Sequence, residues 1–260
     1  MPKICDIFNE YNAVGTWFIQ HDFGQYYTSN YGKVDEKFPN IVEKLSQIGE
    51  IGTHVHFRKK DGKFCSDFEF QKNLIEKATD ALRSKGFKIQ SFRGGDHFFN
   101  NDTIKVLENL NYEIDSSVMQ GFSRRLQDNF LVDHRIRGID ININKPYFLS
   151  NNNYLISGKS HILEIPVTNL LFFLKKPRFF IPFPTPGNKK IGKISNISFL
   201  LTKILGFMKK DAPIVFLFHD FTFNGGKNLD YFRNFIEICT NDKNIKFVTL
   251  KEIKKEYLKK

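Results

Sequence analysis

Short apolar runs alternate with longer amphipathic segments along almost the whole of this 260-residue chain. Runs rich in Val, Ile and Phe are typical of buried strands, whereas apolar residues spaced three and four apart are typical of helices. Strands are predicted at residues 13–19, 50–55, 89–92, 112–118, 161–167, 213–219 and 245–250. Helices are predicted at residues 35–48, 67–86, 101–111 and 230–240. Because strand and helix alternate, the fold class is expected to be α/β with a mostly parallel sheet, and about seven strands favour a barrel of strand-helix units over a sandwich.

Residues 1–260 are expected to form a single domain, because no linker or internal repeat divides the chain. Two polar or proline-rich stretches, at about 121–153 and about 172–192, interrupt the alternation and are expected to be long loops at the rim of the barrel. The chain opens on a helix-like segment that runs directly into the first predicted strand. The barrel is therefore expected to lack its first strand, as in a truncated protein.

The chain is strongly basic, with 39 Lys and Arg against 28 Asp and Glu and a formal net charge of +11. Such a balance favours anionic partners, which include a phosphate-bearing ligand, an acidic glycan, a membrane surface or nucleic acid. The alternative is an ordinary solvated surface rich in lysine. Lysines flank an apolar helical stretch at 188–210, a pattern found in helices that lie on membranes and also in outer helices of a barrel. No nucleic-acid-binding motif accompanies the charge, so nucleic acid is not an expected partner.

The cysteines and the hydropathy of the chain indicate the cellular compartment that is expected. Cys5, Cys65 and Cys239 are far apart without paired spacing, which fits neither a disulfide framework nor a thiolate zinc site. No apolar stretch is long enough for a membrane span, and acidic residues interrupt the region where a signal peptide would be apolar. A cytoplasmic protein is expected, with association at a membrane surface left open.

Two histidines stand one residue apart in EIGTHVHF, at 50–57. Residues i and i+2 of a strand point to the same face, so His54 and His56 can converge on one cation. Neutral imidazole suits zinc, whose catalytic sites take three protein ligands. The alternative is a pair of hydrogen-bonded histidines that close a strand.

A second polar group follows the apolar run FLFHD, where His219 and Asp220 end a predicted strand. In a parallel barrel the carboxyl ends of the strands meet at one rim, which is where catalytic groups gather. A histidine at this rim can give a proton to a leaving group while a carboxylate holds its tautomer. The alternative is a histidine that is simply hydrogen-bonded at the end of a core strand.

A third group lies in FRGGDH, where Arg93 leaves a predicted strand and is followed by Gly94, Gly95 and Asp96. Paired glycines let backbone amides approach a ligand closely, so this loop is a candidate binding site for substrate or oxyanion. The alternative is a common surface turn with an exposed arginine.

Six segments follow one another along the chain: AVGTWFI, GEIGTHVHF, FRGGDHFFNNDTIKVLENLNYEIDSSV, LEIPVT, IVFLFHD and KFVTLKEI. In this order they resemble the landmarks of the polysaccharide deacetylases of the NodB-homology type, carbohydrate esterase family 4. The resemblance covers almost the whole chain and is greatest to the branch that serves lipopolysaccharide and surface-glycan biosynthesis. It implies a deformed (β/α)7-type barrel that removes an acetyl group from an N-acetylated sugar with a divalent metal, usually zinc.

The resemblance also implies roles for particular residues. His54 matches the first metal histidine of the family, Arg93 matches an arginine that follows the next strand, and His219 matches the late histidine that serves as acid. Asp115, in EIDSSV, matches an aspartate at the rim that orients the arginine.

The sequence departs from the family pattern in two places. The second metal histidine of the family stands four residues after the first, where this chain has Arg58, so His56 would replace it. The aspartate pair that ends the opening strand of the family, one the base and one a metal ligand, has no counterpart here. Asp22, which follows WFIQH, lies at the same rim and is the candidate third ligand.

Three functions remain open at this point. The first is a deacetylase of a surface polysaccharide or its nucleotide- or lipid-linked precursor, impaired by the missing strand. The second is an inactive relative that binds a glycan. The third is a basic protein that binds an anionic membrane surface.

Overall fold

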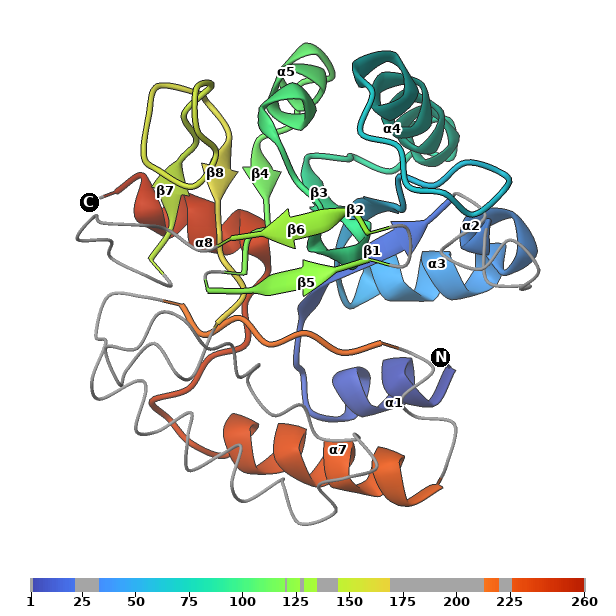
Figure 1. Ribbon diagram of the computed structural model, residues 1–260. Coiled ribbons are helices and arrows are strands. Elements are labelled where there is room, and N and C mark those ends of the chain that lie inside the picture. The colour runs from blue at the N-terminus through green and yellow to red at the C-terminus, as the bar shows by residue number, and fades with distance from the viewer. Residues whose placement is uncertain are drawn as a thin grey trace.

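The computed structural model describes residues 2–21, 33–119, 121–126, 129–134, 145–168, 213–219 and 226–259. Within them, six strands form one sheet in the order β1-β2-β3-β4-β8-β7 (Figure 1). These strands are β1 Gly15–Gln20, β2 Gly49–Val55, β3 Ser91–Gly94, β4 Ile114–Asp115, β8 Leu163–Glu164 and β7 Tyr147–Phe148. Every pairing is parallel except that of β7 with β8 at the edge.

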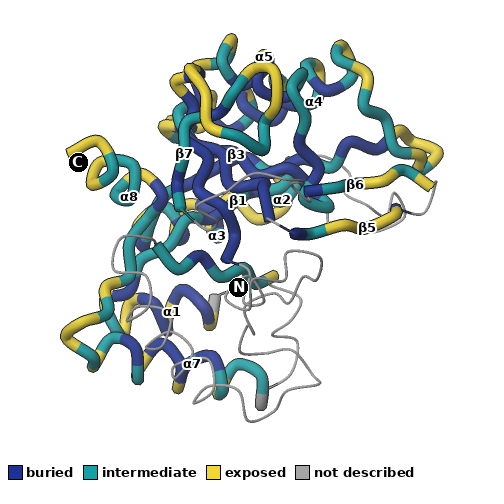
Figure 2. The backbone as a smooth tube through the Cα atoms, turned by 60° about the vertical axis from the view of Figure 1, so that its left-hand side comes forward, coloured by how far each residue is buried: buried dark blue, intermediate teal, exposed yellow. Residues whose placement is uncertain are grey.

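Helices lie around this sheet, and α3 and α4 both contact β2. The helices are α1 Pro2–Glu10, α2 Val34–Lys37, α3 Pro39–Gln47, α4 Phe68–Arg83, α5 Asn101–Asn109, α7 Gly226–Thr240 and α8 Leu250–Tyr257. Figure 2 shows buried backbone at β1 and β3 of this sheet and exposed residues on α5. This pattern follows from helices that turn one apolar stripe toward a buried sheet.

The predicted helix at 35–48 is two helices, because the chain breaks at Phe38 and Pro39. Phe38 has φ −135° and ψ 55°, and Pro39 is the first residue of α3. A proline disfavours helical backbone at the residue before it but is well placed at the start of a helix. The proline therefore ends α2 and begins α3.

The strand predicted at residues 213–219 is not assigned in the structure. The amide of Thr168 donates to the carbonyl of Val215 at 2.9 Å, just beyond β8. Further along, the Phe218 ring contacts the Trp17 ring of β1 with centroids 6.0 Å apart. The segment thus lies between the two sides of the sheet that a closed barrel would join, and no closed barrel forms among the described strands.

The predicted strand at 245–250 is wrong, because α8 begins at Leu250. Thr249 and Glu252 form a capping box, in which each side chain accepts the backbone amide of the other. The start of α8 is also held by β-strand residues, since the Leu250 amide donates to Thr16 Oγ1 at 2.9 Å and the Lys251 amide to Glu50 Oε2 at 3.0 Å. These bonds hold α8 at the edge of the sheet where the parallel strands begin. The predicted site is at the opposite edge, where these strands end.

The polar stretch at 121–153 holds more structure than a loop. Strands β5 Ser123–Arg125 and β6 Leu131–Asp133 form an antiparallel hairpin, and β7 follows within the same stretch. The stretches at 172–192 and 188–210 lie outside the described residues. No helix in the described part of the chain has the length and apolar character that crossing a bilayer requires.

Candidate functional site

The predicted metal histidines lie at the carboxyl end of β2. His54 is level with Arg93 of β3, and its Nδ1 lies 2.8 Å from the Arg93 carbonyl oxygen. A carbonyl can only accept, so Nδ1 carries the proton and Nε2 carries the lone pair. Metal-binding histidines usually have such a partner, which fixes the tautomer and the ring orientation.

His56 follows the end of β2, and its ring meets the His54 ring edge to face with centroids 4.7 Å apart. Gly95 lies against it, because a Cβ atom at Gly95 would stand 2.3 Å from His56 Cδ2. Only glycine therefore leaves His56 in this position. The structure brings together the two histidines that the sequence placed on one face.

A third metal ligand is not supplied within the described part of the chain. Among residues 2–21, 33–119 and the other described ranges, no three His, Cys, Asp or Glu side chains are grouped as a metal site. Asp22, the predicted third ligand, lies outside the described residues. Two neighbouring imidazoles are nonetheless the donor type that zinc prefers.

Arg93 is buried beneath this edge, with 7% of its surface exposed. Its Nε donates to the carbonyl of Ser116 at 2.7 Å and its Nη2 to Ser116 Oγ at 2.6 Å, while its guanidinium lies 4.4 Å from the Phe18 ring centroid. Burial lowers the pKa of Arg93 to about 10, against the opposing charges of Asp115 and Glu164. Arg93 thus keeps its positive charge at neutral pH.

Asp115 contacts the neighbouring serine of the same segment. Its carboxylate accepts the Ser117 amide at 3.0 Å and Ser117 Oγ at 2.7 Å. Ser117 Oγ in turn accepts the amide of Gly94 at 2.8 Å. Asp115 thus holds the glycine pair through Ser117 and acts on Arg93 through charge, whereas the hydrogen bonds of Arg93 go to Ser116.

Asp115 also faces a second buried carboxyl. Glu164 is its register partner on β8, and Glu164 Oε1 accepts the Val118 amide at 3.1 Å. The pKa of Glu164 is raised well above its usual value, first by burial and then by the charge of Asp115. The pKa of Asp115 is raised as well, chiefly by burial. Burial and the neighbouring carboxyl therefore both favour the protonated form of Glu164 beside Arg93.

Replacing Glu164 with Gln is expected to remove a pH dependence of stability. The folded chain keeps the Glu164 proton where the unfolded chain, with a usual pKa of 4.5, has lost it. The free energy of unfolding of the wild type should therefore fall relative to that of the Glu164→Gln variant as pH rises above about 5, by at most about 1.4 kcal/mol per pH unit. Urea unfolding of both proteins from about pH 5 to about pH 8 measures the difference. A constant difference would show that Glu164 is ionised in the folded chain.

The loop after β3 contains two consecutive residues with left-handed backbone, Asp96 with φ 53° and His97 with φ 59°. Arg58 holds this turn, because its Nη2 lies 3.1 Å from Asp96 Oδ2 in an ion pair whose side chains are 4% and 7% exposed. Asp96, a predicted substrate-binding residue, thus forms an ion pair with Arg58 in the structure. A Cβ at Gly94 would stand 2.0 Å from the Phe98 carbonyl oxygen, so the turn also requires that glycine.

His97 is a candidate that the sequence prediction missed. Its Nδ1 lies 3.2 Å from the Ser117 carbonyl, and its ring packs against Phe122. Burial lowers the pKa of His97 to about 3, and the charges of Arg93 and His134 act in the same direction. The charge of His219 also lowers the pKa of His97.

His219 itself is exposed at the end of residues 213–219. Asp220, its predicted partner, lies outside the described residues. His134 is buried and accepts the Met119 amide through Nδ1 at 3.1 Å, with its pKa lowered to about 4 mainly by burial. It comes from the stretch that was predicted to be a rim loop, where no periodic pattern marks a buried histidine.

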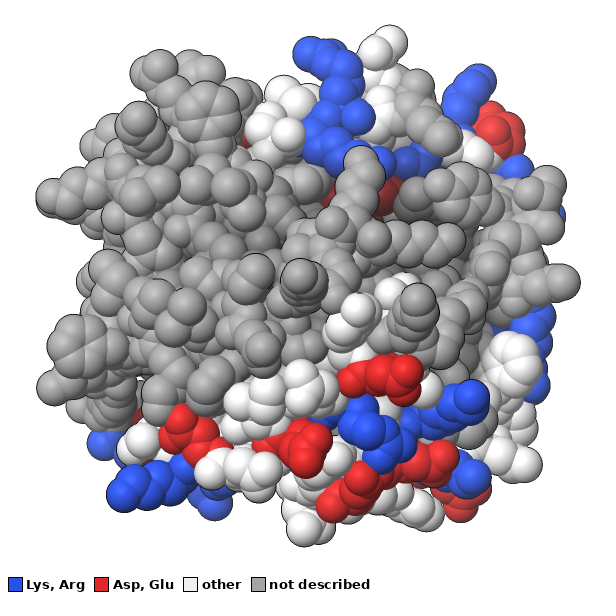
Figure 3. All heavy atoms as spheres, turned by 90° about the horizontal axis from the view of Figure 1, so that it is seen from below, with Lys and Arg blue, Asp and Glu red and all other residues white. Residues whose placement is uncertain are grey.

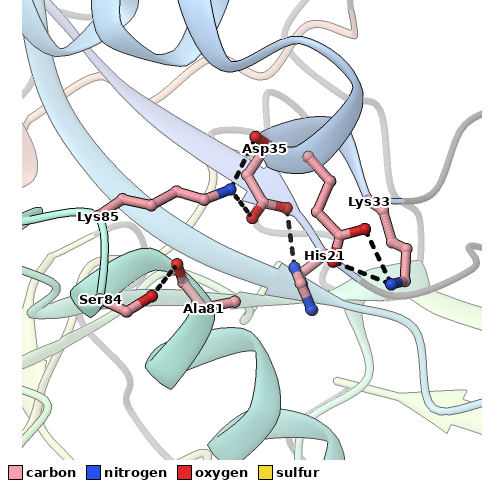
Figure 4. A network of polar contacts seen from close by, with 7 residues as sticks. His21, Lys33, Asp35, Ala81, Ser84 and Lys85 are labelled. Atoms are coloured by element: carbon pink, nitrogen blue, oxygen red, sulfur yellow. Dashed lines mark hydrogen bonds and ion pairs between the residues drawn. The ribbon is translucent and has the colours of Figure 1, made fainter.

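A separate ion network fixes the end of β1 (Figure 4). His21 Nδ1 lies 2.8 Å from Asp35 Oδ1, and Lys85 Nζ donates to the carbonyl of Asp35 at 2.7 Å and to its Oδ2 at 2.5 Å. Burial alone would raise the pKa of Asp35, but the hydrogen bonds from Lys85 and His21 lower it. The network ties α2 to β1 and to the end of α4.

Charge on the surface is mixed where side chains are described. On the face seen in Figure 3, acidic side chains lie among the lysines and arginines along the lower edge. Lys33 pairs with Glu36 at 2.9 Å and Lys105 with Asp102 at 2.9 Å, each three residues apart. These exposed pairs add little stability and dilute the basic charge locally.

Comparison with known proteins shows the fold. No family model and no curated protein sequence matches the chain. A Mycobacterium smegmatis structure described as a polysaccharide deacetylase has a TM-score of 0.62 and 17% identity, over 98% of this chain and 75% of that one. PuuE allantoinase has a TM-score of 0.61 and 16% identity, over 98% and 70%. A Pseudomonas aeruginosa PAO1 structure, also described as a polysaccharide deacetylase, has a TM-score of 0.61 and 13% identity, over 99% and 72%. The likeness confirms the prediction of a deformed (β/α)7-type barrel.

Proposed function

We propose that this protein is a metal-dependent hydrolase that removes the acetyl group from an N-acetylated sugar of a surface polysaccharide or its precursor. The main support is the geometry of His54, whose Nδ1 is committed to the Arg93 carbonyl and whose ring contacts His56. Two similar structures that are described as polysaccharide deacetylases agree with this reaction.

In this proposal His54 and His56 hold a divalent metal, with zinc favoured by the imidazole ligands, and Asp22 is the third ligand expected from the sequence. The bound cation supplies Lewis acidity toward the acetyl carbonyl. His219, exposed at the rim, protonates the departing amine. In this proposal the loop at Gly94 and Gly95 borders the acetyl group, and it is held by the bond from the Gly94 amide to Ser117 Oγ and by the Arg58–Asp96 ion pair.

Acetate release tests the proposal. The purified chain is incubated with oligomers of N-acetylglucosamine after zinc addition and, in parallel, after chelation, and free acetate and free amine are measured. Equal amounts of acetate and amine, released only when zinc is present, are expected. Acetate release that chelation leaves unchanged would contradict the metal, and sugar cleavage without acetate would contradict the reaction.

A further inference from the structure

We propose that Nε2 of His97 accepts a hydrogen bond from the bound sugar, and that the Arg58–Asp96 ion pair positions His97 for this contact. The inference rests on the proposed function, because it assigns the sugar to the same edge of the sheet. It concerns residues at which the sequence departs from the family it resembles, since Arg58 stands where that family has a histidine.

The tautomer of His97 is fixed by its backbone partner. Nδ1 lies 3.2 Å from the Ser117 carbonyl oxygen, which can only accept, so Nδ1 is the donor. Nε2 then carries the lone pair, and it has no hydrogen-bond partner among the residues that the structure describes. His97 is half-buried, so part of the residue is open to solvent.

The neighbours of His97 belong to the proposed site. Ser117 also binds the Gly94 amide, and both Arg93 and His219 are close enough for their charges to lower the pKa of His97. Since that pKa is about 3, the ring is neutral at ordinary pH and acts as an acceptor. A neutral acceptor recognises an uncharged donor, such as a sugar hydroxyl or the N–H of an acetamido group.

The left-handed backbone at Asp96 and His97 is unfavourable in itself and must be stabilised by other contacts. Two consecutive residues other than glycine with φ near 55° are uncommon, and such conformations persist where surrounding contacts fix them. The contact here is the buried Arg58–Asp96 pair, together with the bond from Arg58 Nη1 to the Gly62 carbonyl at 2.9 Å. Arg58 therefore ties the 58–64 turn to the turn that presents His97.

The test compares His97→Asn with the wild type. Asparagine adopts left-handed backbone readily, and its amide can replace Nδ1–H toward Ser117, but it has no acceptor at the position of Nε2. Affinity for the N-acetylglucosamine trimer, measured by calorimetry with zinc present, is expected to fall about tenfold. His97→Gln, whose amide oxygen reaches farther, should recover part of the loss. His161→Asn is the matched control, because His161 is exposed and bonds the Tyr112 carbonyl.

Positioning by the ion pair is tested through Asp96→Asn. This variant keeps left-handed backbone but removes the charge that Arg58 neutralises. It is expected to weaken binding of the same trimer, and the double variant with His97→Asn should bind no more weakly than His97→Asn alone. Additive losses would mean that Asp96 acts independently of His97. NMR of the imidazole nitrogens gives a second readout, in which the Nε2 signal of His97 moves when the trimer is added.

The outcomes separate this inference from the proposed function. Binding that weakens in His97→Asn, without acetate release by any variant, would support the sugar contact and contradict the hydrolase. The contact would be overturned if His97→Asn bound the trimer with full affinity and the Nε2 signal of His97 in the wild type did not move. Acetate release in the same experiments would still support the hydrolase. Absence of both trimer binding and turnover in the wild type would overturn both.

Discussion

Replacing Arg93 with Met is expected to lower the free energy of unfolding by about 3 to 5 kcal/mol and to abolish hydrolysis. Methionine fills much of the same volume and keeps the packing on Phe18. It removes the two hydrogen bonds that Ser116 accepts from Arg93 and leaves the charge of Asp115 buried without Arg93 beside it. Breaking a buried charge pair by removing one partner is costly because the other partner remains desolvated.

Urea unfolding and acetate release measure the two effects of this substitution. Arg125→Met is the matched control, because Arg125 is exposed on β5 and should change the free energy of unfolding by less than about 0.5 kcal/mol. If Arg93→Met were as stable as the control and still released acetate, Arg93 and its buried partners Ser116 and Asp115 would have no part in the site.

Gly95→Ala is expected to lower the zinc affinity about 10- to 100-fold, as changes in the support of a metal ligand do. The added Cβ would stand 2.3 Å from His56 Cδ2, so the His56 ring must move away from its place beside His54. The overpacking should also cost about 1 to 3 kcal/mol of stability. Zinc titration against a competing chelator gives the affinity.

Gly15→Ala controls for the added methyl group. A Cβ at Gly15 would meet its nearest neighbour, Phe8 Cε1, at an ordinary 3.4 Å. This variant should bind zinc like the wild type. Equal zinc affinity in the Gly95→Ala and Gly15→Ala variants would contradict the placement of His56 in the metal site.

The sequence was informative wherever local pattern decides structure. Alternating apolar runs placed β1, β2 and β3, because a strand buried on both faces needs such a run whatever its partners are. The pair at His54 and His56 was predictable for the same reason, since side chains two apart on a strand share a face. The prediction failed at 245–250, where the apolar run has strand propensity. No strand forms at 245–249, and a helix begins at Leu250, where Thr249 caps it and the amides of Leu250 and Lys251 donate to Thr16 and Glu50.

The features that sequence reasoning missed depend on contacts between distant segments. Asp96 has the chemistry of a substrate ligand, and its bond to Arg58 arises only when the turns after β2 and β3 meet. His97 follows a glycine pair that predicts a turn, but the left-handed backbone at His97 and its bond to Ser117 need the tertiary fold. The Asp115–Glu164 pair likewise depends on the register of β4 with β8. Such contacts carry no periodic signal.

The most direct test of the account is the zinc content of the purified chain after dialysis, measured by elemental mass spectrometry beside a His54→Ala variant. If His54 and His56 form a metal site, the wild type retains about one equivalent of zinc and the variant loses it. Zinc retained equally by both, or absent from the wild type even after zinc is supplied, would contradict the metal-dependent hydrolase.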